Sequence, residues 1–306
     1  MHESIKRVSA QVGTVLLGKE HQIKLSVACL LAGGHLLIED LPGMGKTILS
    51  HALARSLGLS YNRIQFTSDV LPADILGIST FDRDTAAFRF HPGPVFAQVV
   101  LADEINRTTP KTQSALLEAM EEGQVTVEGE TRPLPEPFFV IATQNPVSQG
   151  GTYPLPESQL DRFLMRIELG YPDPAAEREL MRGTDRRELL AELRPCLTAD
   201  ELAALQAGAR EVKASDALID YLQRLVQHSR SSADFAWGLS PRGALALLRA
   251  AQAWALVEGR SHVVPEDVQA VLGPVVEHRL RETAGHGMGG GMALAQRLLA
   301  LVDVVD

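Results

Sequence analysis

The chain has 306 residues, which is long enough for a nucleotide-binding core and a second, smaller domain. Hydrophobic residues make up 45% and charged residues 22%, and the formal net charge is -9. This acidic balance disfavours nucleic-acid partners, and no apolar run reaches the roughly 18–20 residues that cross a membrane. The only cysteines, Cys29 and Cys196, form neither a zinc motif nor a disulfide framework, so we expect a cytoplasmic protein.

Strand-like and helix-like segments alternate up to about residue 170. Continuous apolar runs are typical of strands buried on both faces, and helices with readable ends lie between them. Thr109-Pro110, for example, places an N-cap and a first-turn proline before a helix that Gly123 ends. The alternation predicts a parallel α/β sheet. The expected strands are His35–Glu39, Asn62–Phe66, Val95–Glu104, Phe138–Thr143 and Phe163–Leu169.

The segment IEDLPGMGKT, residues 38–47, follows the first strand and ends as a phosphate-binding loop does. The usual pattern is G-x-x-x-x-G-K-[ST]; Gly45-Lys46-Thr47 match its end, and Asp40 stands where its first glycine belongs. Lys46 would neutralise phosphates and the Thr47 hydroxyl would bind Mg²⁺, at the N-terminus of a helix whose dipole favours an anion. Because the first glycine only opens the turn, we expect Asp40 to be tolerated. The residues predicted to bind nucleotide are Leu41, Pro42, Gly43, Met44, Gly45, Lys46, Thr47 and Ile48.

Two acidic residues end the later apolar run VVLADE. Parallel strands place their carboxyl ends on one edge of a sheet, so Asp103 is expected to meet Thr47 there. Asp103 would then hold Mg²⁺, and Glu104 would orient and polarise the attacking water. Together with the loop, these residues predict an ATP hydrolase.

Three further polar residues narrow the class of ATPase. Asn145 follows the run FFVIAT, and a strand between the two preceding motifs would aim it at the γ-phosphate and its water. Arg162 precedes the last core strand, where it could reach the nucleotide of a neighbouring subunit as an arginine finger. Arg242 lies in the first turn of a helix after Ser240-Pro241, where it could touch phosphate across the domain interface.

The remaining segments divide the chain into a core, residues 1–170, and a helical lid, residues 171–306. Within the core, residues 68–95 form an insert before the strand that carries Asp103, and residues 125–137 predict a hairpin around Glu128-Gly129. Exposed Phe88 and Phe90 in the insert favour a contact with a partner. In the lid, Gly285–Gly291 is expected to link a last amphipathic helix.

The order LPGMGKT, VVLADEINR, ATQNP, LPESQLDRF and LSPRG resembles the MoxR family of AAA+ ATPases. The resemblance extends from about Val12 to Arg281, and residues 102–126 are its most specific piece. It implies an αβα core with strand order 5-1-4-3-2, a helical lid and a hexameric ring. It also implies ATP bound between lid and core with Mg²⁺, completed by Arg162 of the next subunit, and an adenine pocket near Gly13–Glu20. Members commonly lack the first loop glycine.

The function implied by this resemblance is chaperone-like remodelling or maturation of a protein client. Metal-cofactor insertion is one form of such maturation, and a von Willebrand factor A domain protein is the expected adaptor. A magnesium-chelatase-like motor subunit is a close alternative. A nucleic-acid motor has the same core, but the acidic balance argues against it, and the insert lacks a lysine, its cations being Arg83 and Arg89. An enhancer-binding activator would need a GAFTGA-like loop, which the insert lacks.

Overall fold

The computed structural model describes residues 2–84, 86–145, 152–183, 185–283 and 293–304. Its centre is a five-stranded sheet in the spatial order β2-β5-β8-β1-β9, with all neighbouring strands parallel. Numbered along the chain, these core strands stand in the order 2-3-4-1-5, which confirms the predicted 5-1-4-3-2 read from the other edge. The strands are β1 (Leu36–Glu39), β2 (Tyr61–Gln65), β5 (Val99–Asp103), β8 (Phe139–Gln144) and β9 (Met165–Ile167).

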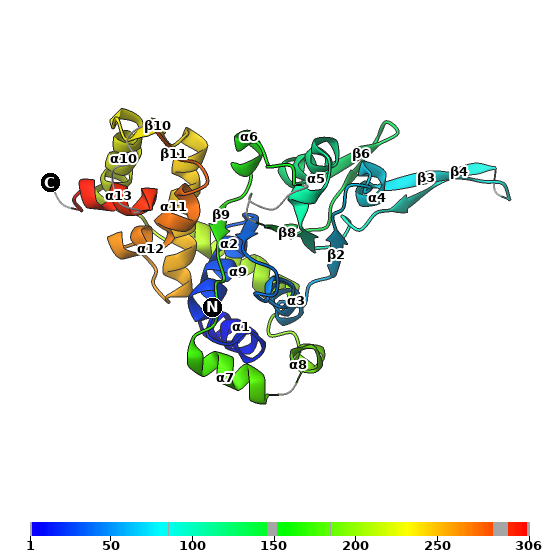
Figure 1. Ribbon diagram of the computed structural model, residues 1–306, viewed down its shortest axis with the longest axis horizontal. Helices are drawn as coiled ribbons and strands as arrows, with labels where there is room; N and C mark the ends of the chain where they lie inside the picture. Colours follow the sequence, from blue (N-terminus) through cyan, green and yellow to red (C-terminus); the bar gives the residue numbers. More distant parts are fainter. Residues whose placement is uncertain (1, 85, 146–151, 184, 284–292, 305–306) are drawn as a thin grey trace.

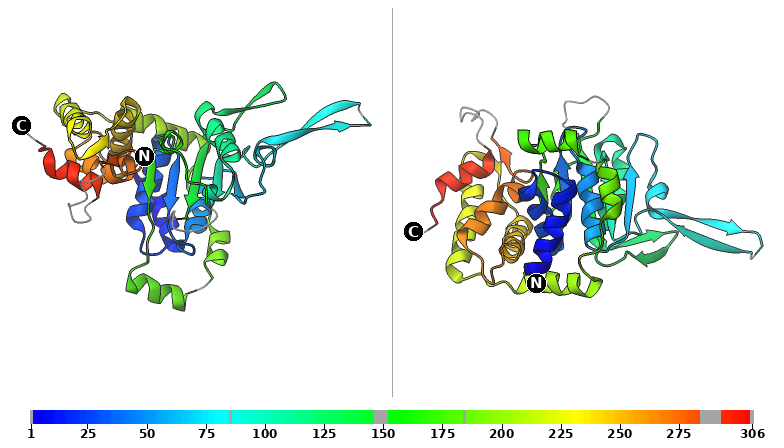
Figure 2. Two further views of the ribbon diagram at one scale, coloured as in Figure 1. Left: turned by 45° about the horizontal axis from the view of Figure 1, so that its top comes forward. Right: turned by 90° about the horizontal axis from the view of Figure 1, so that it is seen from below.

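Helices cover both faces of the sheet. Successive side chains of a strand point to opposite sides, so the apolar strands place apolar side chains on both faces, and both faces must be covered. On β1, Leu36 and Ile38 belong to one buried cluster and Leu37 to another. The first cluster contains apolar residues of α1, α2 and α3, and the second contains those of α4 and α5. The core is therefore a three-layer αβα sandwich (Figure 2). The bounds are α1 (His2–Val15), α2 (Glu20–Leu31), α3 (Lys46–Ser56), α4 (Pro72–Leu76) and α5 (Pro110–Glu122).

The chain after β9 is mainly helical. Helices α8 and α9 run back along the core, where α8 contacts α3 and α9 contacts α2. Helices α10 to α13 gather beyond the β9 edge of the sheet, where α11 packs against α2 and α12 against β9 (Figure 1). The helices are α7 (Pro174–Arg182), α8 (Arg186–Glu192), α9 (Ala199–Glu211), α10 (Asp216–Ser231), α11 (Pro241–Val257), α12 (Pro265–Val276) and α13 (Leu294–Leu301).

Two details of this helical region bear on the predictions. The Ser240 hydroxyl accepts a hydrogen bond of 3.0 Å from the Gly243 N–H, so Ser240 is an N-cap before Pro241. A short antiparallel pair, β10 (Phe235–Trp237) and β11 (Arg281–Glu282), interrupts the helices and was not predicted, since such short strands leave no apolar pattern. Gly285–Gly291 lies outside the described residues.

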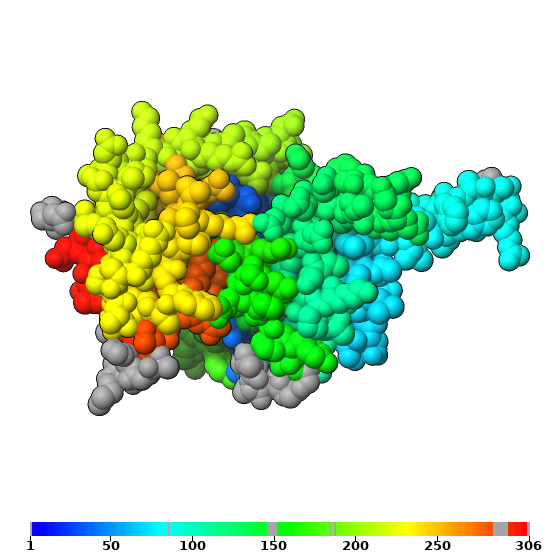
Figure 3. All heavy atoms as spheres, turned by 90° about the horizontal axis from the view of Figure 1, so that it is seen from above, coloured from blue at the N-terminus to red at the C-terminus, as the bar shows by residue number. Residues whose placement is uncertain are grey.

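Two antiparallel hairpins leave the body on the side of β2. One is formed by β3 (Gly77–Asp82) and β4 (Ala87–Pro92), and it projects well beyond the rest of the molecule (Figures 1 and 3). The other is formed by β6 (Gln124–Val127) and β7 (Glu130–Pro133), with Glu128 and Gly129 at positive φ in its turn. Short elements join the rest of the core: the 3₁₀ helix η1 (Ile105–Arg107) and α6 (Glu157–Leu160).

The aromatic residues of the longer hairpin differ in exposure. Phe88 is 73% exposed and packs edge-to-face on Phe81, which is also exposed. Phe90 is half-buried, since the Arg132 guanidinium lies 3.9 Å from its ring centre and Phe96 packs beside it. The expectation that Phe90 is exposed is therefore wrong. Arg132 of the β6–β7 hairpin contacts Phe90 of the β3–β4 hairpin and so links the two hairpins. Among the described helices, none has both the length and the apolar character needed to cross a membrane.

Candidate active site

The predicted phosphate loop connects β1 to α3 and forms one wall of a cavity of about 730 Å³. Gly43 and Gly45 have φ values of 87° and 92°, a region that favours glycine. A Cβ atom on Gly45 would lie only 2.8 Å from Leu16 Cδ1, so a side chain there would also require the Leu16 side chain to move. The residues lining the cavity are Pro42, Gly43, Gly45, Lys46, Thr47, Ile48, His51, Arg63, Asp103, Glu104, Asn145 and Leu190; Leu41 and Met44 are not among them.

Asp40 ties the loop to the end of the sheet. Its Oδ2 accepts hydrogen bonds from the N–H groups of Leu169 (2.8 Å) and Gly170 (2.7 Å), at the point where β9 passes into the helical region. Its Oδ1 accepts the N–H of Leu41 at 2.7 Å. A glycine in this place would leave all three N–H groups without their carboxylate partner. The departure from the usual loop pattern therefore has a structural purpose here.

Lys46 begins α3 and points into the cavity. Its Nζ donates to the Asp40 carbonyl oxygen at 2.6 Å, and the residue is buried. Burial lowers the pKa of Lys46, and the carboxylates of Asp40, Asp103 and Glu104 oppose that shift. An ammonium with two further N–H donors, beside the N-terminus of a helix, is suited to bind an anion.

Asp103 ends β5 on the same side of the cavity. Its Oδ2 accepts two hydrogen bonds from the Arg63 guanidinium, at 3.1 and 2.6 Å, and its Oδ1 accepts the Thr143 hydroxyl at 2.6 Å. The sequence reading missed both partners. Arg63 and Thr143 come from the strands on either side of β5, so only the sheet order and register bring them together.

Glu104 is held in an unusual conformation directly after Asp103. Its φ is 56°, which is uncommon for a residue other than glycine, and its N–H donates to the Thr143 hydroxyl at 2.8 Å. Its carboxylate accepts hydrogen bonds from Asn145 (3.1 Å), Gln65 (3.1 Å) and Arg107 (2.9 Å). A strained backbone at a carboxylate that lines a cavity is typical of a functional position.

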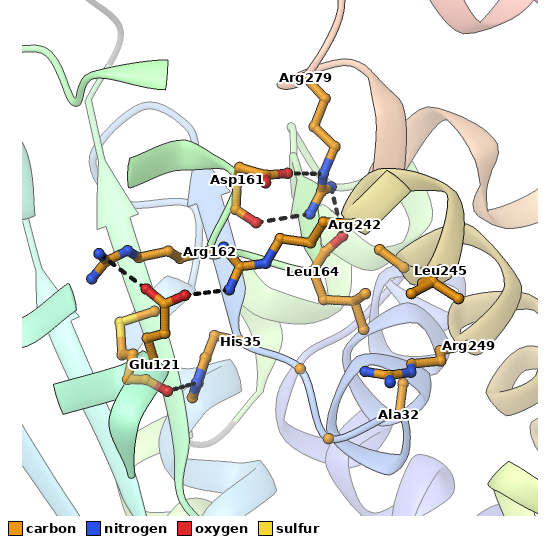
Figure 4. Close-up of a pocket in the computed structure, with 14 residues that line it drawn as sticks. Ala32, His35, Glu121, Asp161, Arg162, Leu164, Arg242, Leu245, Arg249 and Arg279 are labelled. Atoms are coloured by element: carbon orange, nitrogen blue, oxygen red, sulfur yellow. Dashed lines mark hydrogen bonds and ion pairs between the residues drawn. The ribbon is translucent and has the colours of Figure 1, made fainter. Parts of the chain in front are cut away.

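Arg162 and Arg242 lie elsewhere. Both line a second cavity of about 320 Å³ between α5, β9 and the helical region, and neither is among the described residues that line the loop cavity. The two guanidinium groups converge on Glu121 of α5, Arg162 at 3.0 Å and Arg242 at 2.7 Å (Figure 4). The hydrogen bond from Arg242 lowers the pKa of Glu121. The structure thus brings together Lys46, Asp103, Glu104 and Asn145, and pairs the two arginines at a separate place.

The five-stranded order, the glycine-lysine-threonine loop at the sheet edge and the helical lid define an AAA+ ATPase fold. Residues 35–165 match the family model for the ATPase family associated with various cellular activities (AAA), and residues 227–294 match the AAA lid domain. Within that class, the chain belongs to the MoxR family.

Three similar proteins illustrate this membership. The chain is 46% identical to protein YeaC of Bacillus subtilis over 92% of its own length and 88% of that protein. It is 40% identical to chaperone MoxR1 of Mycobacterium tuberculosis, over 90% of its own length and 75% of that protein. A solved structure from Cytophaga hutchinsonii superposes with a TM-score of 0.90 at 36% identity, covering 100% of this chain and 96% of that one.

Proposed function

We propose that this protein binds and hydrolyses ATP at the loop cavity, in a ring of identical subunits, and uses the turnover to remodel a protein client. The observation that carries the proposal is that Lys46, Asp103 and Glu104, from two different parts of the chain, line one cavity. Hydrolysis needs a cation for the phosphates, oxygen ligands for a metal and a carboxylate for the water, and these residues provide all three.

The phosphates would lie against the loop and the first turn of α3. Gly43 and Gly45 let backbone N–H groups approach the phosphate oxygens, and the Lys46 ammonium would leave the Asp40 carbonyl oxygen to bind the β- and γ-phosphates. His51 stacks on Tyr61 at a ring distance of 4.5 Å and forms a wall of the cavity beside the loop.

The residues present fit a magnesium ion. Thr47 and Asp103 both face the loop cavity, and hydroxyl and carboxylate oxygens are the donors that Mg²⁺ prefers. When bound, Mg²⁺ would neutralise charge on the β- and γ-phosphates.

Glu104 would orient the attacking water and accept its proton as the bond between the γ-phosphorus and the bridging oxygen breaks, giving ADP and phosphate. Asn145 fixes one oxygen of this carboxylate, and its own Oδ1 is buried without a hydrogen-bond partner.

Arg162 and Arg242 would act on the nucleotide of the neighbouring subunit. Arg242 was expected to touch phosphate across its own domain interface, but its guanidinium lies on Glu121, outside the lining of its own loop cavity. The pair of arginines is suited to stabilise the negative charge that develops on a neighbour's γ-phosphate. A closed ring, which we take to be a hexamer, gives every site such a neighbour.

For the client side we propose a chaperone-like role with a von Willebrand factor A domain adaptor, including metal-cofactor insertion as one form of maturation. MoxR1 of Mycobacterium tuberculosis carries the name chaperone. In this chain, the exposed Phe81 and Phe88 at the projecting end of the β3–β4 hairpin would contact the protein partner. We expect no nucleic-acid partner and a cytoplasmic location.

Mixing two inactive variants tests the shared site. Arg162→Ala should keep ATP binding but lose at least 10²-fold in kcat, since an arginine finger contributes about 10³–10⁵ in other nucleotide hydrolases. Lys46→Ala should lose ATP binding and keep its arginines. Mixed rings should recover turnover, because an Arg162→Ala site can then receive Arg162 from a Lys46→Ala neighbour. Recovery that fails, in mixtures shown to form joint rings, would contradict the shared site.

A further inference from the structure

Arg162, the proposed arginine finger, lies on the loop between α6 and β9. The loop consists of Asp161 to Leu164, and at its end the Leu164 N–H donates to the His35 carbonyl oxygen, just before β1, at 2.8 Å. The Arg162 side chain is 25% exposed, and among the described residues its guanidinium forms an ion pair only with Glu121. A catalytic group on such a loop needs support from neighbouring residues if it is to reach a reacting phosphate accurately.

That support comes from one buried side chain of the lid. Arg279 follows α12 and lies directly beside Asp161 of the loop, at the edge of the second cavity (Figure 4). Its Nε donates to Asp161 Oδ1 at 2.7 Å. Its Nη2 donates to the carbonyl oxygens of Asp161 (3.1 Å) and Phe163 (2.7 Å), and its Nη1 donates to that of Leu164 (3.1 Å). The lid thus holds the backbone immediately before and after Arg162.

The geometry makes this contact specific to arginine. The Arg279 side chain is only 5% exposed, and its planar guanidinium donates from three separate nitrogens at once, which the single nitrogen of a lysine ammonium cannot reproduce. The neighbouring His278 adds a contact of 3.0 Å between its Nε2 and the Phe163 carbonyl oxygen. Losing the guanidinium would leave a carboxylate and several carbonyl groups of the loop without donors, so the loop would rearrange.

We propose that Arg279 is a positioning residue for the arginine finger: the lid of each subunit sets the position of that subunit's own Arg162, and so controls hydrolysis in its neighbour. This inference rests on the proposed function of Arg162. It follows that a movement of the lid relative to β9 would move Arg162 away from the ATP site of the neighbouring subunit or return it there. Arg242 is itself a lid residue, and the loop of Arg162 is held by the lid residue Arg279. Both Arg162 and Arg242 would therefore move with the lid.

Arg279→Lys tests the proposal by its kinetic pattern. It should lower kcat for ATP with little change in KM, because it removes an interaction made only in the transition state at the neighbour's site. A misplacement of about 1 Å costs on the order of 10²-fold in rate. In a chain that already carries Arg162→Ala, the same lysine substitution should cause no further loss in kcat. A further loss in that double variant would overturn the proposal, because Arg279 would then act by another route.

The matched control is Arg260→Lys. Arg260 forms an ion pair with the fully buried Asp267 elsewhere in the lid, so it reports the effect of weakening a lid ion pair without touching the finger loop. It should keep kcat near that of the unmodified chain. An equal loss of kcat in both lysine variants would overturn the proposal. If Arg279→Lys fails to fold, Asp161→Ala carries the test, because Asp161 is more exposed and its removal takes away the carboxylate by which Arg279 holds the same loop.

The mixing experiment separates this inference from the proposed function. Arg279→Lys subunits should have intact loop cavities and a displaced finger, so Lys46→Ala subunits should restore their turnover as they restore that of Arg162→Ala. Restoration of Arg162→Ala but not of Arg279→Lys would overturn the positioning role and leave the shared site standing. Failure to restore either variant, in rings shown to be mixed, would overturn the shared site itself and the inference with it.

Discussion

The side-chain amide of Asn145 donates a hydrogen bond of 3.1 Å to Oε1 of Glu104. The two residues come from the ends of neighbouring strands, β8 and β5. Because Asn145 holds the carboxylate that is proposed to orient water, Asn145→Ala should lower kcat by about 10²-fold, the cost of a misplacement of about 1 Å. Its KM for ATP should change little, and steady-state kinetics would measure both.

The control for that variant is Asn62→Ala. Asn62 is also on a core strand, but its amide donates to the Pro94 carbonyl oxygen at 3.0 Å, away from the loop cavity. This control should retain its kcat. A kcat for Asn145→Ala equal to that of the control would show that the amide does not position Glu104.

Asp40 provides a prediction about the loop itself. Asp40→Gly restores the usual first glycine of a phosphate loop, but it removes the hydrogen bonds to the N–H groups of Leu169 and Gly170. Hydrogen bonds to a charged group contribute about 1.5–3 kcal/mol each, so we expect the loss of these two to lower the free energy of unfolding by roughly 3–6 kcal/mol. Asp40→Asn keeps one oxygen and should lie between the two. Urea denaturation of the unmodified chain, Asp40→Asn and Asp40→Gly measures this order. Equal free energies of unfolding would contradict a stabilising role for the hydrogen bonds from Leu169 and Gly170 to Asp40.

His35 makes stability depend on pH. Desolvation by burial lowers the pKa of its imidazole from 6.5 to about 4, and its Nδ1 accepts the Val140 N–H at 3.0 Å. The unfolded chain therefore binds a proton between these values and the folded chain does not. The stabilisation is present above pH 6.5 and is lost as pH falls towards 4; it amounts to about 3 kcal/mol for this residue.

The measurement for His35 is the free energy of unfolding at several pH values in that window. Burial also lowers the pKa of His21, His51 and His278, so the slope of the unmodified chain contains several residues. His35→Asn keeps an acceptor near Nδ1 and removes the proton-binding site. It should therefore show a shallower fall in stability between pH 6.5 and 4, and an unchanged slope would be inconsistent with a buried neutral His35.

Much of the fold was predictable because its determinants are local. Apolar strands alternating with capped helices lead to a parallel sheet, and the common edge of parallel strands brings Lys46 and Asp103 together. A long apolar run such as Phe139–Gln144 is fully buried, as its composition predicts. The family resemblance added the strand order, which the pattern of residues alone does not determine.

The rest depends on contacts between distant parts of the chain. Asp40 accepts hydrogen bonds from Leu169 and Gly170, about 130 residues later in the sequence. The sequence pattern therefore predicts that Asp40 is tolerated in the loop but does not identify its hydrogen-bond partners. The position of Arg242 depends on how the lid docks on the core, and no local signal places it on Glu121. The same holds for Arg63, since a charged residue in a short strand reads as solvent-exposed until the register places it beside Asp103.

The most direct test of the account is the nucleotide bound to Glu104→Gln after incubation with ATP and Mg²⁺ and removal of free nucleotide. Glutamine preserves the shape of the side chain and its contact with Asn145 but cannot accept a proton from water. The account predicts that this variant retains ATP unhydrolysed, while Lys46→Ala treated in the same way retains no nucleotide. Recovery of ADP from Glu104→Gln at the rate of the unmodified chain, or of ATP from Lys46→Ala, would contradict the convergence of these residues on one triphosphate.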